Sequence, residues 1–240
     1  MIERTITKNL KTALFKGKAI LLIGPRQVGK TTLLHFIANE YKKPYLWLNA
    51  DESDIALKLE NTTSTELKAL IGQNKLVIVD EAQVIKNIGK TLKLITDSLK
   101  DVQVIATGSS AFELRNKMNE PLTGRKNEFN LYPITIAEMN ANHGELAEGR
   151  LLEHRLIYGF YPEVINNIGE EQKTLRDLSG SYLYKDLLMI DGIKKASMLD
   201  KLLQALALQL GNEVSYTELA QLLGGVDPAT VEKYIDLLEK

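Results

Sequence analysis

The stretch Gly24-Pro-Arg-Gln-Val-Gly-Lys-Thr31 is the strongest indication of fold in this 240-residue chain. It places a second glycine five residues after the first, followed directly by lysine and threonine, which is the G-x-x-x-x-G-K-[ST] pattern of a phosphate-binding loop (P-loop). An apolar run, Ala19–Ile23, precedes the loop, and a helical pattern begins at Thr32. The mechanism of phosphate binding requires this strand–loop–helix context. The sequence therefore predicts a nucleoside-triphosphate-binding fold.

The residue types in this loop suit a bound triphosphate. Glycines let backbone N–H groups wrap around phosphates, and the helix that follows adds the positive end of its dipole. Lys30 is expected to reach the β- and γ-phosphates, and the Thr31 hydroxyl to ligate Mg²⁺. Arg26 also lies close to phosphate, or pairs with a nearby acid instead. The residues predicted to bind the nucleotide are Gly24, Pro25, Arg26, Gln27, Val28, Gly29, Lys30, Thr31 and Thr32.

A second apolar run, Leu76–Val79, ends in two acids, Asp80 and Glu81. A carboxylate at the tip of a buried strand is the Walker-B arrangement, in which Asp80 holds Mg²⁺ and Glu81 orients and deprotonates the attacking water. The alternative for Asp80 is a residue that caps the next turn, and the alternative for Glu81 is a solvated acid. An acid directly after the Walker-B aspartate favours hydrolysis over phosphoryl transfer to a small acceptor.

Polar residues also follow the apolar run Val102–Ala106. In P-loop ATPases with an additional strand, that strand lies between the P-loop strand and the Walker-B strand. A polar residue at its tip, Ser109 or Thr107, is then expected to contact the γ-phosphate or the attacking water. Helix capping by Ser109 or Ser110 is the competing interpretation.

Asn49 and Arg125 are predicted to complete the catalytic group. Asn49 ends the run 44–50, which should lie beside the Walker-B strand, so it is expected to hydrogen-bond Glu81 and hold the base inactive. Its alternative is a simple turn residue. Arg125 lies in a loop expected at the nucleotide-facing end of the sheet. We interpret it as an arginine finger toward its own γ-phosphate or that of a neighbouring subunit, with a solvated arginine as the alternative.

Five short β-rich runs alternate with helical patterns up to about Pro133. They cover residues 19–24, 44–50, 75–81, 102–108 and 128–133. Continuous apolar strands between helices indicate an α/β fold with a parallel sheet of about five strands sandwiched by helices. A P-loop ATPase domain of the additional-strand type is therefore expected over residues 1–140.

Strand patterns stop after Ile134, and a smaller all-helical domain is expected over residues 150–240. An apolar stripe at helical spacing comprises Leu199, Leu202, Leu203, Leu206 and Leu210. Ser215 and Glu218 have the spacing of a capping box, and Asp227 can cap a last helix that begins at Pro228. The apolar face of that helix is Val231, Tyr234, Ile235 and Leu238. Residues 214–238 thus predict a helix-turn-helix, as in an incomplete winged helix.

The composition excludes several classes of function. The chain has no cysteine, which excludes disulfides, a thiol nucleophile and Cys-ligated zinc. No apolar run approaches the ~20 residues of a membrane helix. The N-terminal residues also lack the apolar core of a secretory signal, so a cytoplasmic protein without a membrane partner is expected. The formal net charge of −1 gives no support for a dedicated nucleic-acid binder.

Taken together, these residues resemble a family of bacterial and archaeal AAA+-type ATPases that carry a C-terminal domain of unknown function. The matching stretches are GPRQVGKTTL (24–33), LVIVDEAQ (76–83), VIATGSSAFEL (104–114), PLTGR (121–125), LYPITIAEM (131–139) and YGFYPEVI (158–165). The resemblance spans essentially the whole chain. It implies binding of ATP, ATPase activity and a winged-helix part in the second domain. Family members continue beyond the position of Lys240, so the resemblance also implies a C-terminally truncated chain.

The leading hypothesis is an ATPase whose hydrolysis of Mg-ATP switches the attached helical domain, slowly unless a partner is present. A homo-oligomer and an unidentified protein partner fit this hypothesis. The alternative is an ATP-regulated DNA-binding protein that uses the helix-turn-helix. Charge argues against DNA, because residues 194–240 carry five lysines against seven acids. A GTPase would show an Asn-Lys-x-Asp guanine reader, whereas the run 74–77 is Asn-Lys-Leu-Val.

Overall fold

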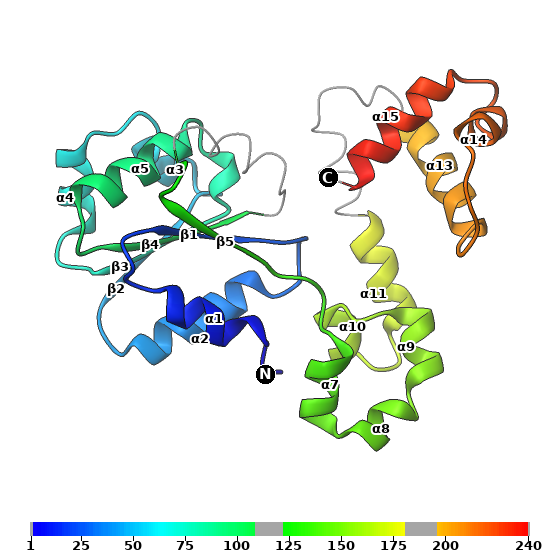
Figure 1. Cartoon of the computed structure of the whole chain (residues 1–240), viewed down its shortest axis with the longest axis horizontal. Helices are drawn as coiled ribbons and strands as arrows, with labels where there is room; N and C mark the ends of the chain where they lie inside the picture. Colours follow the sequence, from blue (N-terminus) through cyan, green and yellow to red (C-terminus); the bar gives the residue numbers. More distant parts are fainter. Residues whose placement is uncertain (1, 109–121, 181–195, 240) are drawn as a thin grey trace. The chain divides into compact units, whose positions relative to one another are not determined.

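The computed structural model describes residues 2–108, 122–180 and 196–239 (Figure 1). The chain divides into two compact units, Met1–Glu171 and Gln172–Lys240. No helix in the described ranges is both long and apolar enough to cross a membrane.

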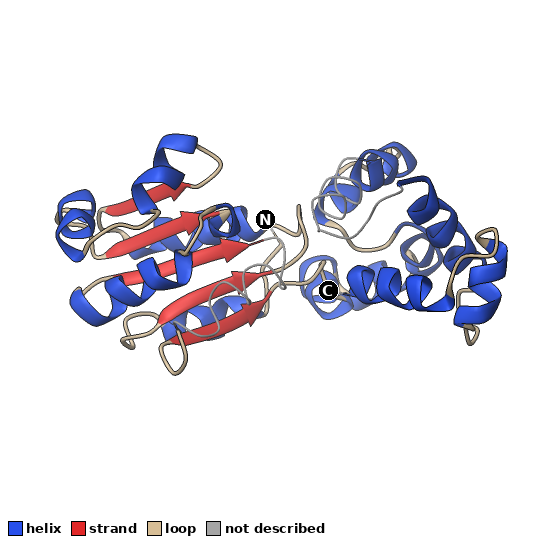
Figure 2. Cartoon of the chain, turned by 90° about the horizontal axis from the view of Figure 1, so that it is seen from above, coloured by secondary structure: helices blue, strands red, loops and turns tan. Residues whose placement is uncertain are grey.

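A five-stranded parallel sheet forms the centre of the first unit, with the strand order β2-β3-β4-β1-β5. Its strands are β1 (Ala19–Ile23), β2 (Tyr45–Asn49), β3 (Leu76–Asp80), β4 (Gln103–Gly108) and β5 (Lys126–Asn130). As predicted, β4 lies between the P-loop strand β1 and the Walker-B strand β3. Because all four pairings are parallel, the carboxyl ends of the strands meet at one edge of the sheet (Figure 2).

Helices cover both faces of this sheet (Figure 1), which confirms the predicted α/β fold. One face carries α1 (Ile6–Ala13) and α2 (Lys30–Tyr41), and the other carries α3 (Ser53–Leu59), α4 (Ser64–Ile71) and α5 (Ile88–Ser98). Successive residues of β1 therefore enter different cores: Leu21 packs with α4 and α5, whereas Leu22 packs with α1 and α2. Burial on both faces explains why the central strands are apolar at nearly every position.

The edge strand β5 begins earlier than the sequence predicted. The prediction was 128–133, and the strand runs from Lys126 to Asn130. Its residues are only half-buried or exposed, because a strand at the edge of a sheet has a neighbour on one side only. Lys126 and Asn127 thus carry no apolar signal that would mark the start of the strand. The consequence is that Arg125 immediately precedes β5.

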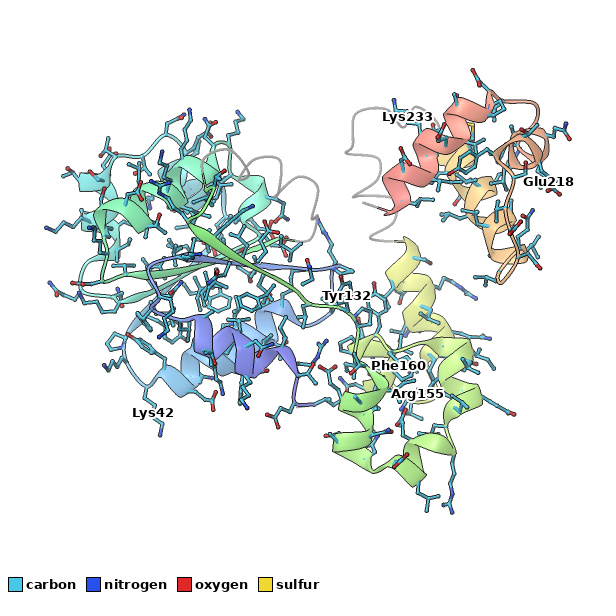
Figure 3. The ribbon with its side chains drawn as sticks, viewed as in Figure 1. Lys42, Tyr132, Arg155, Phe160, Glu218 and Lys233 are labelled. Carbon is cyan, nitrogen blue, oxygen red and sulfur yellow. The ribbon has the colours of Figure 1, made fainter. Side chains whose placement is uncertain are left out.

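Short helices follow β5 within the first unit. They are α7 (Ile136–His143), α8 (Glu145–Gly149), α9 (Leu152–Tyr158) and α10 (Pro162–Asn166). A capping box formed by Thr135 and Glu138 begins α7. A small apolar cluster of Ile134, Met139 and Ile165 packs α7 against α10, with Ile2 and Phe160 beside it. The guanidinium of Arg155 lies 6.0 Å from the centre of the Phe160 ring (Figure 3).

The described part of the second unit is helical, as predicted, and contains most of α11 (Glu171–Leu178) with α13 (Ala196–Leu208), α14 (Tyr216–Leu222) and α15 (Pro228–Glu239). Its core unites the predicted apolar faces of α13 and α15 through residues that include Leu199, Leu202, Leu219, Val231 and Tyr234.

Two local predictions for the second unit were wrong, and one is confirmed. Leu210 lies beyond the end of α13 and is exposed, so it is not part of the apolar stripe. Ser215 is the N-cap residue of α14, but its side chain makes no capping hydrogen bond, so the capping box with Glu218 does not form. Asp227 does cap α15, because its Oδ1 accepts a hydrogen bond from Ala229 N at 3.0 Å.

Candidate nucleotide-binding site

The predicted P-loop connects β1 to α2 at the carboxyl edge of the sheet, and its two glycines are required by local geometry. A Cβ atom on Gly24 would lie 2.1 Å from the carbonyl oxygen of Leu131, so a side chain cannot fit where the loop passes the end of β5. Gly29 caps α2 with a φ of 95°, in the left-handed region that favours glycine. The loop therefore depends on glycine at both positions, whatever it binds.

Lys30 is the first residue of α2, and its side chain is buried. Its ammonium group donates hydrogen bonds to the carbonyl oxygens of Gly24 at 2.8 Å and Pro25 at 2.9 Å. These bonds hold a positive charge inside the curve of the loop, beside a helix N-terminus. Both features attract an anionic phosphate group. Of the other predicted loop residues, Val28 is buried, Arg26 is half-buried, and Pro25, Gln27, Thr31 and Thr32 are exposed.

Hydrogen bonds link the P-loop to the Walker-B strand and to β4. Thr31 Oγ1 donates to Asp80 Oδ2 at 3.0 Å, and Thr107 Oγ1 donates to Asp80 Oδ1. Thr107 also accepts a hydrogen bond from the backbone N–H of Glu81 at 3.0 Å. Because a threonine hydroxyl has one proton, Thr107 gives its donor to Asp80 and not to a phosphate. Thr107 thus positions the two acids, and the other candidate at this strand end, Ser109, lies outside the described residues.

The side-chain oxygens of Thr31 and Asp80 fit a magnesium ion. Mg²⁺ binds oxygen ligands and is typically held by one or two carboxylates together with substrate phosphates. Across the described ranges, no group of three or more His, Asp or Glu side chains gathers that could hold a metal by itself. A cation at this edge would therefore need the phosphate oxygens of a nucleotide to complete its coordination shell.

Glu81 adopts an uncommon backbone conformation at the end of β3. Its φ of 52° and ψ of 40° lie in the left-handed region, which a non-glycine residue rarely occupies and which is frequent at functional sites. The carboxylate accepts a hydrogen bond from Nε2 of the buried Gln83 at 2.5 Å. Sequence reasoning missed Gln83. Its position in a tight turn two residues after the predicted base was the available signal.

Asn49 pairs with Asp80 across β2 and β3, so its predicted position beside the Walker-B strand is confirmed. The predicted hydrogen bond to Glu81 is absent between these two described residues. Asn49 Oδ1 instead accepts from the N–H of Asp51 at 3.1 Å, an Asx turn that matches the alternative interpretation.

Arg125 lies at the opposite edge of the sheet from the P-loop, which corrects the prediction for its loop. Its carbonyl oxygen accepts from Ala19 N at 2.9 Å, at the start of β1, and its Nε is 2.7 Å from Asp97 Oδ1 on α5. The five residues of β1 separate the two edges by roughly 16 Å at about 3.3 Å per residue. Arg125 therefore cannot reach the phosphate site of its own chain, and a role at a neighbouring subunit stays a prediction.

A buried ion pair that the sequence did not predict supports the outer side of the P-loop. The side chains of Arg4 and Glu138 are only 8% and 3% exposed, and Arg4 Nε lies 3.1 Å from Glu138 Oε2. Burial by itself raises the pKa of Glu138. Hydrogen bonds from Thr135 and Thr5, with the Arg4 charge, outweigh burial and lower that pKa. No sequence pattern connects residues 134 positions apart.

A small cavity of about 150 Å³ adjoins the P-loop. It is lined by Ile2, Arg4, Val28, Gly29, Thr32, Leu33, Ile134, Pro162 and Asn166. Its walls are mostly apolar, and Arg4, Thr32 and Asn166 contribute polar groups. Sequence reasoning missed this cavity, because its walls come from the N-terminus, the P-loop helix and the helices after β5.

The fold is that of an AAA-type P-loop ATPase. The sequence matches the family described as an AAA domain over residues 16–140, slightly more than half of the chain. The chain belongs to this family. Residues 149–240 match a second family, described as a domain of unknown function. The two family matches meet between 140 and 149, whereas the compact units meet at Glu171.

Relatives of the chain include proteins of known and unknown role. An uncharacterized protein of Mycobacterium bovis and Mycobacterium tuberculosis is 28% identical over 238 residues, which are 98% of this chain and 51% of the relative. The replication factor C large subunit of Methanococcus vannielii is 39% identical over 69 residues, 28% of this chain and 14% of the subunit. The chain thus spans about half the length of the first of these relatives.

Among solved structures, the chain resembles a Walker-type ATPase of Pyrococcus abyssi. The TM-score is 0.70 at 16% sequence identity, and the match covers 100% of this chain and 89% of the other. At this level of identity the likeness concerns the fold alone.

Proposed function

We propose that the chain binds Mg-ATP at the carboxyl edge of its sheet and hydrolyses it to ADP and phosphate. The observation that carries this proposal is the hydrogen-bond network that joins Thr31, Asp80, Thr107 and Glu81 beside the buried ammonium of Lys30. Within this network Asp80 and Thr107 are buried, whereas Thr31 is exposed and Glu81 is half-buried. A structural strand end needs no such set of linked polar groups. A phosphate site does, because charge that develops in the transition state must meet dipoles and charges already in place.

Each of these residues has a distinct part in the proposed reaction. Lys30 and the N-terminus of α2 bind the β- and γ-phosphates, while Thr31 and Asp80 would hold Mg²⁺, which neutralises phosphate charge. Thr107 fixes the positions of Asp80 and the Glu81 backbone. The Glu81 carboxylate accepts the proton of the attacking water. Since Gln83 donates to that carboxylate, Glu81 must share or leave this hydrogen bond to reach the water.

The base of the nucleotide is assigned to the cavity beside the P-loop, and we propose that it is adenine. The run that comes closest to a guanine reader, Asn74–Val77, lacks the aspartate and ends inside β3. The apolar walls contributed by Ile2, Leu33 and Ile134 favour stacking of a flat ring over specific recognition of guanine.

Calorimetry with Mg-ATP and Mg-GTP, followed by phosphate release, tests this proposal. We expect wild type to bind Mg-ATP more tightly than Mg-GTP and to release phosphate slowly. Lys30→Ala should weaken ATP binding by about ten- to over a hundredfold, because a charge-assisted contact contributes about 1.5–3 kcal/mol. Lys93→Ala, on the exposed side of α5, is the control and should bind like wild type. Unchanged affinity in folded Lys30→Ala would refute the phosphate site.

We further propose that nucleotide turnover acts on the helical second unit, and that this unit contacts a protein and not DNA. The surface of α15 exposes Glu232 and Asp236 against one lysine, Lys233, and α14 exposes Glu218. Figure 3 labels Lys233 and Glu218 on these two helices. Acidic groups on both helices disfavour a phosphate backbone. Fluorescence anisotropy with a labelled random duplex at low salt should show no binding. Binding that weakens steeply with added salt would favour the DNA alternative instead.

A further inference from the structure

We propose that Arg4 is a positioning residue for the P-loop, and that its ion pair with Glu138 couples the P-loop to helices α7–α10. The inference rests on the proposed nucleotide site. It states how binding of a nucleotide at the P-loop would change the position of helices α7–α10 in the first unit.

Arg4 fixes the orientation of one peptide bond in the P-loop. Arg4 Nη1 donates to the carbonyl oxygen of Val28 at 2.9 Å. In a trans peptide the carbonyl of one residue and the N–H of the next point in opposite directions, and the described residues contain no cis peptide. By holding the Val28 carbonyl, Arg4 therefore turns the Gly29 N–H to the other side of the loop. Glycine restricts its own backbone little, so this peptide needs an external support.

The other nitrogens of the same guanidinium contact the chain beyond the P-loop. Nη2 donates to the carbonyl oxygens of Tyr132 and Pro133, in the segment between β5 and α7, and Nε donates to Glu138 at 3.1 Å. Figure 3 labels Tyr132 in this segment. The planar guanidinium group of Arg4 thus donates hydrogen bonds to the P-loop, to the segment after β5 and to the first turn of α7. Lysine could not replace it, because an ammonium group has no such spread of donors.

Glu138 is held as firmly as its partner. Besides Arg4, its carboxylate accepts from the backbone N–H of Thr5 at 2.8 Å, from Thr5 Oγ1 at 3.1 Å and from Thr135 N at 2.9 Å. Both charges are buried and satisfied, so a movement that separates them leaves an uncompensated charge. A shift of the P-loop peptide must therefore move Arg4 and, with it, the start of α7.

The cavity beside the P-loop is lined by residues from both of the parts that Arg4 connects. Arg4 and Gly29 line one part of it, while Ile134 and the α10 residues Pro162 and Asn166 line another. A nucleotide whose phosphates meet the P-loop and whose base enters the cavity would touch both ends of the link. Occupancy of the site and the position of α7–α10 are then set together.

The test compares variants of two buried ion pairs in the same unit. Arg4→Met breaks the proposed link. Arg155→Met breaks the pair of Arg155 and Glu148, whose side chains are 5% and 4% exposed and whose Nε–Oε1 distance is 2.7 Å, within α8 and α9. Both variants should lose stability to urea. We expect Arg4→Met to bind Mg-ADP about tenfold or more weakly by calorimetry, and Arg155→Met to stay within about twofold of wild type.

Hydrogen exchange then measures the coupling itself. In wild type, saturating Mg-ADP should slow exchange of the amides at 28–31 and also at 136–143. Arg4→Met at saturation should keep the first effect and lose the second, and Arg155→Met should keep both. Glu138→Gln leaves the Val28 contact in place, so it should keep affinity within about threefold but lose the effect on 136–143. A purely structural role of Arg4 would not separate the two segments.

The outcomes distinguish this inference from the proposed function. If wild type binds no nucleotide, the proposed function is wrong. If wild type binds and Arg4→Met matches Arg155→Met in both affinity and exchange, the inference about Arg4 alone is overturned. Should Arg4→Met not fold, Arg4→Lys keeps the charge without the fork. We expect it to bind Mg-ADP about three- to tenfold more weakly, and wild-type affinity with intact exchange coupling in that variant would equally overturn the inference.

Discussion

The two edges of the sheet differ in how their charged groups are held. At the carboxyl edge, Lys30 and Asp80 are buried, and hydrogen bonds connect them to the loop and to the neighbouring strands. At the amino edge, Arg125 and Asp97 form a close pair, but their side chains are 44% and 42% exposed. The buried set has lost its hydration and depends on fixed partners, whereas the exposed pair exchanges with water and salt.

This difference predicts where substitutions change chemistry. Groups at the carboxyl edge are positioned by one another, so removal of one should disturb binding or turnover in each protomer. A group at the amino edge can influence a nucleotide only across an interface with another copy, and it should contribute little to its own protomer.

Glu81→Gln should have the largest effect on turnover. The amide keeps the shape of the carboxylate but cannot accept the proton of water, so we expect phosphate release to fall by about 10²–10⁴ while ATP affinity is kept or raised. Glu40→Gln, an acid on the surface end of α2, is the matched control. Steady-state phosphate release and ATP calorimetry check both variants. Turnover like wild type in Glu81→Gln would place the base at another residue.

Thr107→Val should lower turnover by about ten- to a hundredfold, because the buried Asp80 carboxylate and the Glu81 N–H each lose a partner worth about 1–3 kcal/mol. Thr91→Val is the matched control, because it also removes a buried threonine hydroxyl. Thr91 is also buried, and its hydroxyl donates to the Leu59 carbonyl at 2.7 Å, away from the site. Both variants should unfold at lower urea concentration, yet only Thr107→Val should change kcat for Mg-ATP. Equal kcat in the two variants would reduce Thr107 to a packing residue.

Acid should weaken the fold through Glu138. Burial raises the pKa of Glu138, but hydrogen bonds from Thr135 and Thr5 and the Arg4 charge together lower it by more. The pKa in the folded protein therefore lies below the value in the unfolded chain. Its stabilising contribution is therefore complete above the unfolded pKa of about 4.3 and is lost as pH falls through the folded pKa. Urea unfolding between about pH 7 and pH 3.5 measures this contribution. The free energy of unfolding should fall less steeply with decreasing pH in Glu138→Gln than in wild type. If the free energy of unfolding depended on pH equally in both proteins, Glu138 would not contribute to acid unfolding.

Arg125→Ala should have the smallest effect on the isolated protomer. An exposed pair contributes about 0–1 kcal/mol, so unfolding and ATP affinity should stay near those of wild type. If Arg125 serves a neighbouring subunit, turnover of the variant should fall only at concentrations where the wild type assembles. Mixing Arg125→Ala with Glu81→Gln should then restore some activity, because a mixed pair contains one complete site. Turnover within about twofold of wild type at every concentration would make Arg125 a surface residue.

The sequence specified the parts of the molecule in which the signal is local. The P-loop of Gly24–Thr31 and the acids after Val79 lie in consecutive residues, and the buried strands around them are apolar because both faces of the sheet are covered. Together with the class of ATPase that they indicate, these runs predicted that β4 lies between β1 and β3 and that β2 lies beside β3. Because parallel strands bring their carboxyl ends to one edge, they also predicted that Thr31 and Asp80 serve one magnesium site.

Which distant or polar residues meet depends on the tertiary structure and could not be predicted from the sequence. The start of β5 is polar because it lies at the edge of the sheet, and this hid the fact that Arg125 faces away from its own P-loop. Arg4 and Glu138 are each ordinary charged residues in the sequence. They become a buried pair because the N-terminal segment, the P-loop and α7 converge in space, and long-range convergence leaves no periodic trace in the chain.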